Sequence, residues 1–357
     1  KDIKPGSGQS FANNVAPFKN GVVFSANDGT NGSEIWISDG TEEGTYLVKD
    51  VTNTSPYTGP NLITVVNDTI FYVYDDTTNG AELWKSDGTE EGTGILLDIE
   101  PGPDDSGPNR LLSFNNQLYF TAHTSAYGQE WWTSDGTTAG TTLLEDLNPG
   151  SGSISPAYPT MVGEALFFYT SIASQNAGLW KIGPLLPEIQ FVVSTSTIFA
   201  TAPVNLKDQL IFTQQSLEIG DQLWISDGTE EGTTLIKDIG GNNPNTSSFF
   251  SNNDPGAILP NGLYVFPFAL AGSSSDHDLW VSDGSAEGTQ LLYDFEYAST
   301  PKYFTTVGDK AFFSANSFPG GREPWITDGT PEGTMQLADI YPSSTNSHPQ
   351  PIGIRGE

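Results

Sequence analysis

Short apolar runs separated by polar turn residues recur along the whole chain. In residues 110–147 four such runs occur, at 111–114, 117–122, 130–134 and 141–147. Runs of this length that are rich in aromatic and β-branched residues and bounded by Asn, Asp and Gly are typical of β-strands. No stretch shows a sustained 3.6-residue period, so we expect almost no helix. The pattern therefore predicts four strands in this segment.

This pattern repeats in units of about 48 residues, each marked by one tryptophan. Consecutive tryptophans are 48 residues apart three times and 44 to 56 residues apart thereafter. The seven tryptophans at this repeat position are Trp36, Trp84, Trp132, Trp180, Trp224, Trp280 and Trp325, and the eighth tryptophan of the chain, Trp131, lies beside Trp132. The units extend over approximately 11–52, 60–100, 109–148, 157–198, 201–240, 256–297 and 301–341. A fixed period of this length is the signature of a repeat architecture.

The strands are covered on both faces. Val22–Phe24, Leu166–Phe168 and Ala311–Phe313 are continuous apolar runs instead of alternating ones, which indicates sheets buried on both sides. Seven four-stranded antiparallel sheets packed face to face predict an all-β chain, a seven-bladed β-propeller forming one domain over residues 1–357. An open β-solenoid or a pair of sandwich domains is the alternative. Because the tryptophans share one register, we expect them in the core between blades.

Six of the seven units carry one string almost intact. In the second unit, Glu82–Thr93, it reads Glu-Leu-Trp-x-x-Asp-Gly-Thr followed by x-x-Gly-Thr. This string resembles the bacterial ELWxxDGT repeat family over nearly the whole chain. Members of that family are secreted or surface-exposed, and many are large and multidomain. The resemblance implies an extracellular, repeat-built protein that binds or adheres, and it implies no reaction.

Composition excludes several classes of function. With 13 Lys and Arg against 44 Asp and Glu, the net charge is −31, which argues against nucleic-acid partners and against anionic membrane surfaces. Cysteine is absent, so there is neither a disulfide scaffold nor a thiolate-ligated zinc site. No apolar run approaches the roughly 20 residues of a membrane-spanning helix. The acidic residues are spread along the chain, and many belong to the repeated hairpins.

These observations favour binding over catalysis. The sequence has no nucleophile elbow, phosphate-binding loop or dinucleotide fingerprint. We therefore expect a non-enzymatic binding or adhesion module, extracellular or at the cell surface. Its partner would be a carbohydrate or a surface protein, recognised through loops at one face of the propeller. The alternatives are a polysaccharide-active lyase or hydrolase with its site at the channel mouth, and a structural spacer within a larger surface protein.

Candidate ligand residues lie where units depart from the repeat. Phe249 and Phe250 occupy the longest polar insertion, Gly240–Pro255, and are candidates for ligand contact. His123 and Tyr127 share the loop of the third unit. The sequence does not exclude calcium as a cofactor, because residues with the oxygen ligands that calcium prefers are plentiful. The candidate calcium ligands are Asp75 and Asp76 in one acidic pair and Asp104 and Asp105 in another.

The repeated Asp-Gly-Thr segments have a structural interpretation. Asp can bond the backbone two residues on, Gly takes a positive φ, and the Thr hydroxyl satisfies another backbone group. We therefore expect structural turns, and a direct ligand role is the alternative. These aspartates are Asp39, Asp87, Asp135, Asp227, Asp283 and Asp328.

Both ends of the chain fall within the repeat frame. Lys1–Ser7 matches the end of a unit, and Pro349–Gly356 resembles the start of another. Either the segment belongs to a longer array or the ends meet. The second interpretation predicts that Lys1–Ile3 lies close to Ile352–Arg355.

Overall fold

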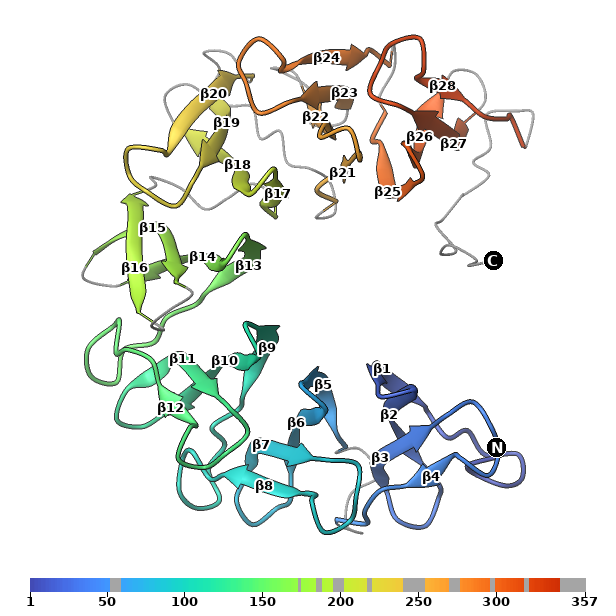
Figure 1. Cartoon of the computed structure of the whole chain (residues 1–357), viewed down its shortest axis with the longest axis vertical. Helices are drawn as coiled ribbons and strands as arrows, with labels where there is room; N and C mark the ends of the chain where they lie inside the picture. Colours follow the sequence, from blue (N-terminus) through green and yellow to red (C-terminus); the bar gives the residue numbers. More distant parts are fainter. Residues whose placement is uncertain are drawn as a thin grey trace. The chain divides into compact units, whose positions relative to one another are not determined.

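The computed structural model describes residues 1–51, 59–172, 175–183, 188–194, 202–216, 220–239, 254–269, 277–295, 299–317 and 321–340. In these ranges the chain forms 28 strands and no helix. Each set of four consecutive strands makes one sheet, which gives seven four-stranded antiparallel sheets (Figure 1). This confirms the all-β prediction and the fold class of a seven-bladed β-propeller. Residues 352–355, which were expected near Lys1–Ile3, lie outside the described ranges.

The chain divides into two compact units, the first built mainly from Lys1–Ser155. This unit holds three sheets. The first contains β1 (Asn13–Phe18), β2 (Gly21–Asn27), β3 (Ser33–Ser38) and β4 (Tyr46–Leu47). The second contains β5 (Asn61–Val66), β6 (Thr69–Asp75), β7 (Ala81–Ser86) and β8 (Gly94–Leu97). The third contains β9 (Asn109–Phe114), β10 (Gln117–Thr124), β11 (Gly128–Ser134) and β12 (Thr142–Leu143).

The second unit holds four sheets. The fourth sheet contains β13 (Ala157–Val162), β14 (Ala165–Ile172), β15 (Gln175–Ile182) and β16 (Ile189–Ser194). The fifth contains β17 (Val204–Leu206), β18 (Gln209–Ser216), β19 (Gly220–Ser226) and β20 (Thr234–Asp238). The sixth contains β21 (Ala257–Ile258), β22 (Tyr264–Ala269), β23 (His277–Ser282) and β24 (Gln290–Tyr293). The seventh contains β25 (Lys302–Val307), β26 (Lys310–Ser317), β27 (Gly321–Thr327) and β28 (Met335–Gln336).

Two-residue turns join the first and second strands of several sheets. Asn67 and Asp68, between β5 and β6, have φ values of 46° and 61°, and Asn115 and Asn116, between β9 and β10, have 47° and 61°. Positive φ at both central positions defines the hairpin turn whose twist matches the flanking strands, and Asn and Asp tolerate it best. The polar pairs in the sequence therefore set the register of these hairpins.

The repeat tryptophans pack one sheet against the preceding one. Trp84 of the second sheet joins a buried cluster with Phe18, Ile35 and Ile37 of the first sheet. Trp280 and Trp325 make the equivalent contacts in the second unit. The third sheet differs, because Trp131 is 0% exposed while the repeat residue beside it, Trp132, is only partly buried.

In the second, third and seventh sheets, a buried glutamate two positions before the repeat tryptophan holds the segment that leaves the sheet. Glu82 accepts hydrogen bonds from Ile99 N at 3.0 Å, Ser106 N at 2.9 Å and Ser106 Oγ at 2.5 Å. Glu323 accepts one from Ile340 N at 3.0 Å. The sequence showed this glutamate as part of a repeated string, but the string alone does not reveal what it binds. The structure shows that it anchors the connection between sheets.

The glutamate of the third sheet has fewer hydrogen bonds than Glu82 has in the second sheet. Glu130 accepts a hydrogen bond from Asn148 N at 3.0 Å. Its Oε2 atom is buried and has no hydrogen-bond partner among the described residues. The position equivalent to Ser106 in the next repeat is occupied by Ile154. Ile154 is a buried apolar residue, so its side chain cannot donate a hydrogen bond to Glu130. Burial, reinforced by Asp146 and Glu145, raises the pKa of Glu130 to about 7.

Glu130 therefore predicts a pH-dependent loss of stability. Because its pKa is higher in the folded chain than in the unfolded chain, the folded state binds more protons between about pH 4.5 and 7. The free energy of unfolding should fall by roughly 2 to 3 kcal/mol from this group as pH rises through that window. Denaturant titrations of the wild type and Glu130→Gln at pH 5 and pH 8 measure this contribution. The variant should lose less stability than the wild type between the two pH values, and equal losses would contradict the prediction.

Candidate functional site

The predicted ligand residues of the third sheet lie on one hairpin. His123 is on β10, where it pairs with Gln129 of β11. Tyr127 lies in the turn between these strands, and its backbone N–H donates to Thr124 Oγ1 at 3.1 Å. Both side chains are exposed. Phe249 and Phe250 lie outside the described residues.

The predicted calcium ligands Asp75 and Asp76 serve the turn between β6 and β7. Asp75 Oδ1 accepts a hydrogen bond from Thr77 N at 2.7 Å, and Asp76 Oδ1 accepts one from Asn79 N at 2.8 Å. Hydrogen bonds from the backbone of Asn79 and Thr78 lower the pKa of Asp76, although burial opposes them. Both aspartates therefore stabilise this turn through their Oδ1 atoms. The Oδ2 atom of Asp75 makes no hydrogen bond within the turn.

Asp104 and Asp105, the other candidate pair, lie between the second and third sheets. Asp105 Oδ1 accepts a hydrogen bond from Ala81 N at 2.7 Å. Ala81 pairs with Asp75 across β6 and β7, so the fold brings the two acidic pairs to one end of the second sheet. Across the described parts of the chain, no three or more His, Cys, Asp or Glu side chains group so that they could hold a metal ion.

The six repeated aspartates close hairpins between the third and fourth strands. Asp87 Oδ1 accepts hydrogen bonds from Thr89 Oγ1 at 2.7 Å and Thr89 N at 2.8 Å, and these contacts lower its pKa. A Cβ atom on Gly92 would lie 2.1 Å from Asp87 Oδ1, which explains the second Gly of the string. The same Asp-to-Gly approach occurs at Asp39, Asp135, Asp227, Asp283 and Asp328.

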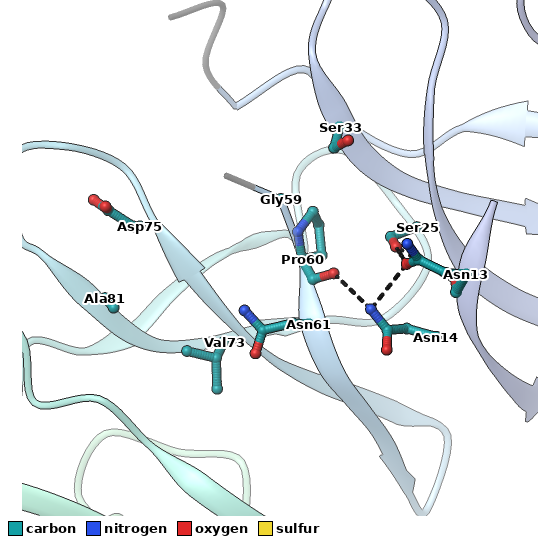
Figure 2. A pocket seen from close by; sticks show the side chains of 10 residues that line it. All are labelled: Asn13, Asn14, Ser25, Ser33, Gly59, Pro60, Asn61, Val73, Asp75 and Ala81. Carbon is teal, nitrogen blue, oxygen red and sulfur yellow. Dashed lines mark hydrogen bonds between the residues drawn. The ribbon is translucent and has the colours of Figure 1, made fainter. Parts of the chain in front are cut away.

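A polar cavity of about 430 Å³ lies between the first and second sheets. Figure 2 shows it from close by, with Asp75 and Ala81 at one side of the view and Asn13, Asn14 and Ser25 at the other. Its volume falls in the range of small-ligand sites. The residues that line it are Asn13, Asn14, Ser25, Ser33, Gly59, Pro60, Asn61, Val73, Asp75 and Ala81.

Asn14 connects the two sides of this cavity. Its Nδ2 atom donates to Pro60 O at 3.2 Å and to Asn13 Oδ1 at 2.9 Å. Ser25 Oγ also donates to Asn13 Oδ1. These bonds tie β1 to the segment that enters β5. Gly59 completes the wall, because its backbone packs so closely on Ser33 that an added Cβ would lie 2.4 Å from Ser33 Cβ.

Other polar groups of the cavity are available to a ligand. Within the described ranges, the side chains of Asn61 and Ser33 make no hydrogen bond. Asn61 sits at the start of β5, opposite Val73 of β6. A carboxamide offers two N–H donors and an acceptor oxygen. The cavity thus presents unpaired neutral donors and acceptors on a framework held by the Asn14 contacts.

Residues close in sequence to the cavity lining include exposed apolar side chains, two of them on left-handed backbone. Phe11 and Leu62 have φ values of 50° and 53°, and they are 65% and 40% exposed. Val15, next to Asn14, is 64% exposed. The left-handed φ of Leu62 recurs at the second residue of the first strand in other sheets, at Asn14, Arg110, Tyr158 and Tyr303, so it belongs to the repeat.

Comparison with known proteins identifies similar folds. No protein-family model and no curated protein matches the sequence. A structure from a study of two prolyl endopeptidases is 10% identical over 92% of this chain and 50% of that chain, with a TM-score of 0.49. A puromycin-hydrolysing peptidase from Mycobacterium tuberculosis is 11% identical over 96% of this chain and 55% of that one, also with 0.49. The β-propeller domain of the Trilobed protease from Pyrococcus furiosus is 12% identical over 93% of this chain and 98% of that chain, with a TM-score of 0.39.

These findings correct the functional prediction. The expected adhesion module finds no counterpart among these structures, which are described as prolyl endopeptidases and puromycin hydrolases. This chain spans about half the length of those structures. At 10 to 12% identity the likeness concerns the fold, so the role has to be argued from the chain's own residues. The resemblance to the ELWxxDGT repeat family stays a prediction.

Proposed function

We propose that this chain is a peptide-binding β-propeller domain with a peptidase-related role. The cavity between the first and second sheets is the proposed peptide site. The observation that carries the proposal is the free carboxamide of Asn61 in a cavity to which five of the ten lining residues contribute neutral polar side chains. Its oxygen and N–H₂ groups suit the N–H and C=O groups of a peptide backbone.

The surroundings of the cavity support the same ligand class. A peptide presents backbone amides together with side chains, many of them apolar. Asn61, Ser33 and the Asn13–Asn14 pair supply polar groups inside the cavity. Phe11, Val15 and Leu62, which are close in sequence to these residues, are exposed apolar side chains. Ligand sites of this kind combine a few placed polar groups with apolar contact area.

Replacing Asn61 with alanine should weaken peptide binding about tenfold. The variant loses the hydrogen bonds that one carboxamide would make with the peptide. The probe is the peptide Ala-Leu-Ala-Leu-Ala with a free amino terminus and a fluorescent label at its carboxyl end. Fluorescence anisotropy of the full chain with this peptide gives the dissociation constant.

Asn109→Ala is the matched control. Asn109 starts β9 one repeat after Asn61 and lies outside the cavity lining. This variant should bind the peptide as the wild type does. The proposal fails if the wild type does not bind the peptide, or if Asn61→Ala and Asn109→Ala bind it equally well.

A further inference from the structure

Asp75 is the one charged side chain among the ten residues that line the cavity. It ends β6 and is half-buried. Its Oδ1 atom accepts the hydrogen bond from Thr77 N, and the carboxylate makes no ion pair within the described part of the chain. Such a carboxylate is the natural partner of a positively charged ligand group, because a nearby cation favours the ionised carboxylate.

Neighbouring lysines are engaged elsewhere. Lys19 Nζ donates to Asp87 O at 3.1 Å, Lys49 Nζ to Thr93 O at 2.6 Å and Lys85 Nζ to Gly136 O at 2.7 Å. Each of these bonds joins one sheet to a hairpin of the next sheet. These three lysines therefore connect neighbouring sheets. No lysine is among the residues that line the cavity.

We propose, on the basis of the peptide-binding function above, that Asp75 accepts a primary ammonium group of the bound peptide. The ammonium is the free amino terminus or a lysine side chain. Charge complementarity carries this assignment, because the cavity holds a single unpaired carboxylate and the chain has a net charge of −31. A divalent cation fits less well, since the described residues contain no acidic cluster of the size that would hold one.

The arrangement of the cavity gives the peptide a direction. Asp75 and Ala81 lie at one side of the view in Figure 2, and Asn13 and Asn14 lie at the other. Asn61 starts the strand that pairs with the strand of Asp75. An ammonium group at Asp75 would lie at the side of the cavity opposite the Asn13–Asn14 pair. The site would select peptides by a charged group at one end.

Three labelled peptides test this assignment, each titrated against the wild type, Asp75→Asn and Asp68→Asn. Asp68→Asn is the control, because it changes an exposed carboxylate at the opposite end of the same sheet. The peptides are Ala-Leu-Ala-Leu-Ala with a free amino terminus, its N-acetyl form, and an N-acetyl form with lysine at the first position. All titrations contain a chelator, so that no divalent cation bridges protein and peptide.

We expect the wild type and Asp68→Asn to bind the free-amine peptide about ten times more tightly than the N-acetyl peptide, as for a hydrogen bond to a charged group. Asp75→Asn should bind both peptides equally. Tight binding of the N-acetyl lysine peptide would identify the side chain as an accepted source of the ammonium, and weak binding would restrict the site to the amino terminus. Equal wild-type binding of all three peptides would overturn the ammonium assignment and leave peptide binding intact. No binding of any peptide would instead refute the proposed function.

Discussion

Replacing Trp84 with alanine is expected to lower the free energy of unfolding by about 3 to 5 kcal/mol. Trp84 is buried between the first and second sheets, where its ring lies 5.4 Å from the ring of Tyr74 and 6.2 Å from that of Tyr72, centroid to centroid. The substitution removes the largest side chain of this cluster and leaves a cavity that β-sheets on both sides cannot readily fill. Denaturant titration of the full chain, followed by circular dichroism, measures the loss.

Tyr127→Ala is the control for Trp84→Ala. Tyr127 is 43% exposed in the turn between β10 and β11, so its loss should change the free energy of unfolding by less than about 0.5 kcal/mol. A Trp84 variant that is no less stable than the Tyr127 variant would contradict the packing of the sheets described above.

Replacing Glu82 with alanine is expected to cost about 4 kcal/mol. Glu82 accepts three hydrogen bonds, from Ile99 N, Ser106 N and Ser106 Oγ, and all of these donors are in the buried connection to the third sheet. Removing the carboxylate leaves these donors unpaired, and each unpaired buried group costs about 1 to 3 kcal/mol. Chemical denaturation at pH 7 gives the total loss.

Glu82→Gln separates the loss of acceptors from the loss of charge. The amide keeps one acceptor oxygen, so this variant should lose less stability than Glu82→Ala. Amide hydrogen exchange adds a local measurement: the N–H groups of Ile99 and Ser106 should exchange faster in the alanine variant. Unchanged exchange at both positions would show that Glu82 does not hold this connection.

Periodicity predicted the fold because the fold is itself periodic. The spacing of the tryptophans and the polar pairs such as Asn115-Asn116 mark strands and turns that depend on near neighbours in the chain. Each of the seven sheets lies within one predicted repeat unit. The role of Glu82 was not predictable in the same way, because its donors, Ile99 and Ser106, are 17 and 24 residues away and carry no distinctive side-chain signal.

The cavity could not be predicted from the repeat. Its lining comes from six strands and the segment before β5, and the polar residues Asn13, Ser33 and Asn61 belong to no repeated string. Asp75 was singled out in the sequence as a calcium ligand, and it does line the cavity, but the structure brings no second carboxylate into that lining. The acidic pair Asp75-Asp76 in the sequence located one acid of the site, and only the approach of β1 to β5 between neighbouring sheets could reveal the other residues.

A crystal structure of the full chain with Ala-Leu-Ala-Leu-Ala bound would test the central claim most directly. We predict that the peptide occupies the cavity between the first and second sheets, with its backbone hydrogen-bonded to the side chain of Asn61. A peptide bound elsewhere on the chain, with the cavity free of it, would contradict the proposed site.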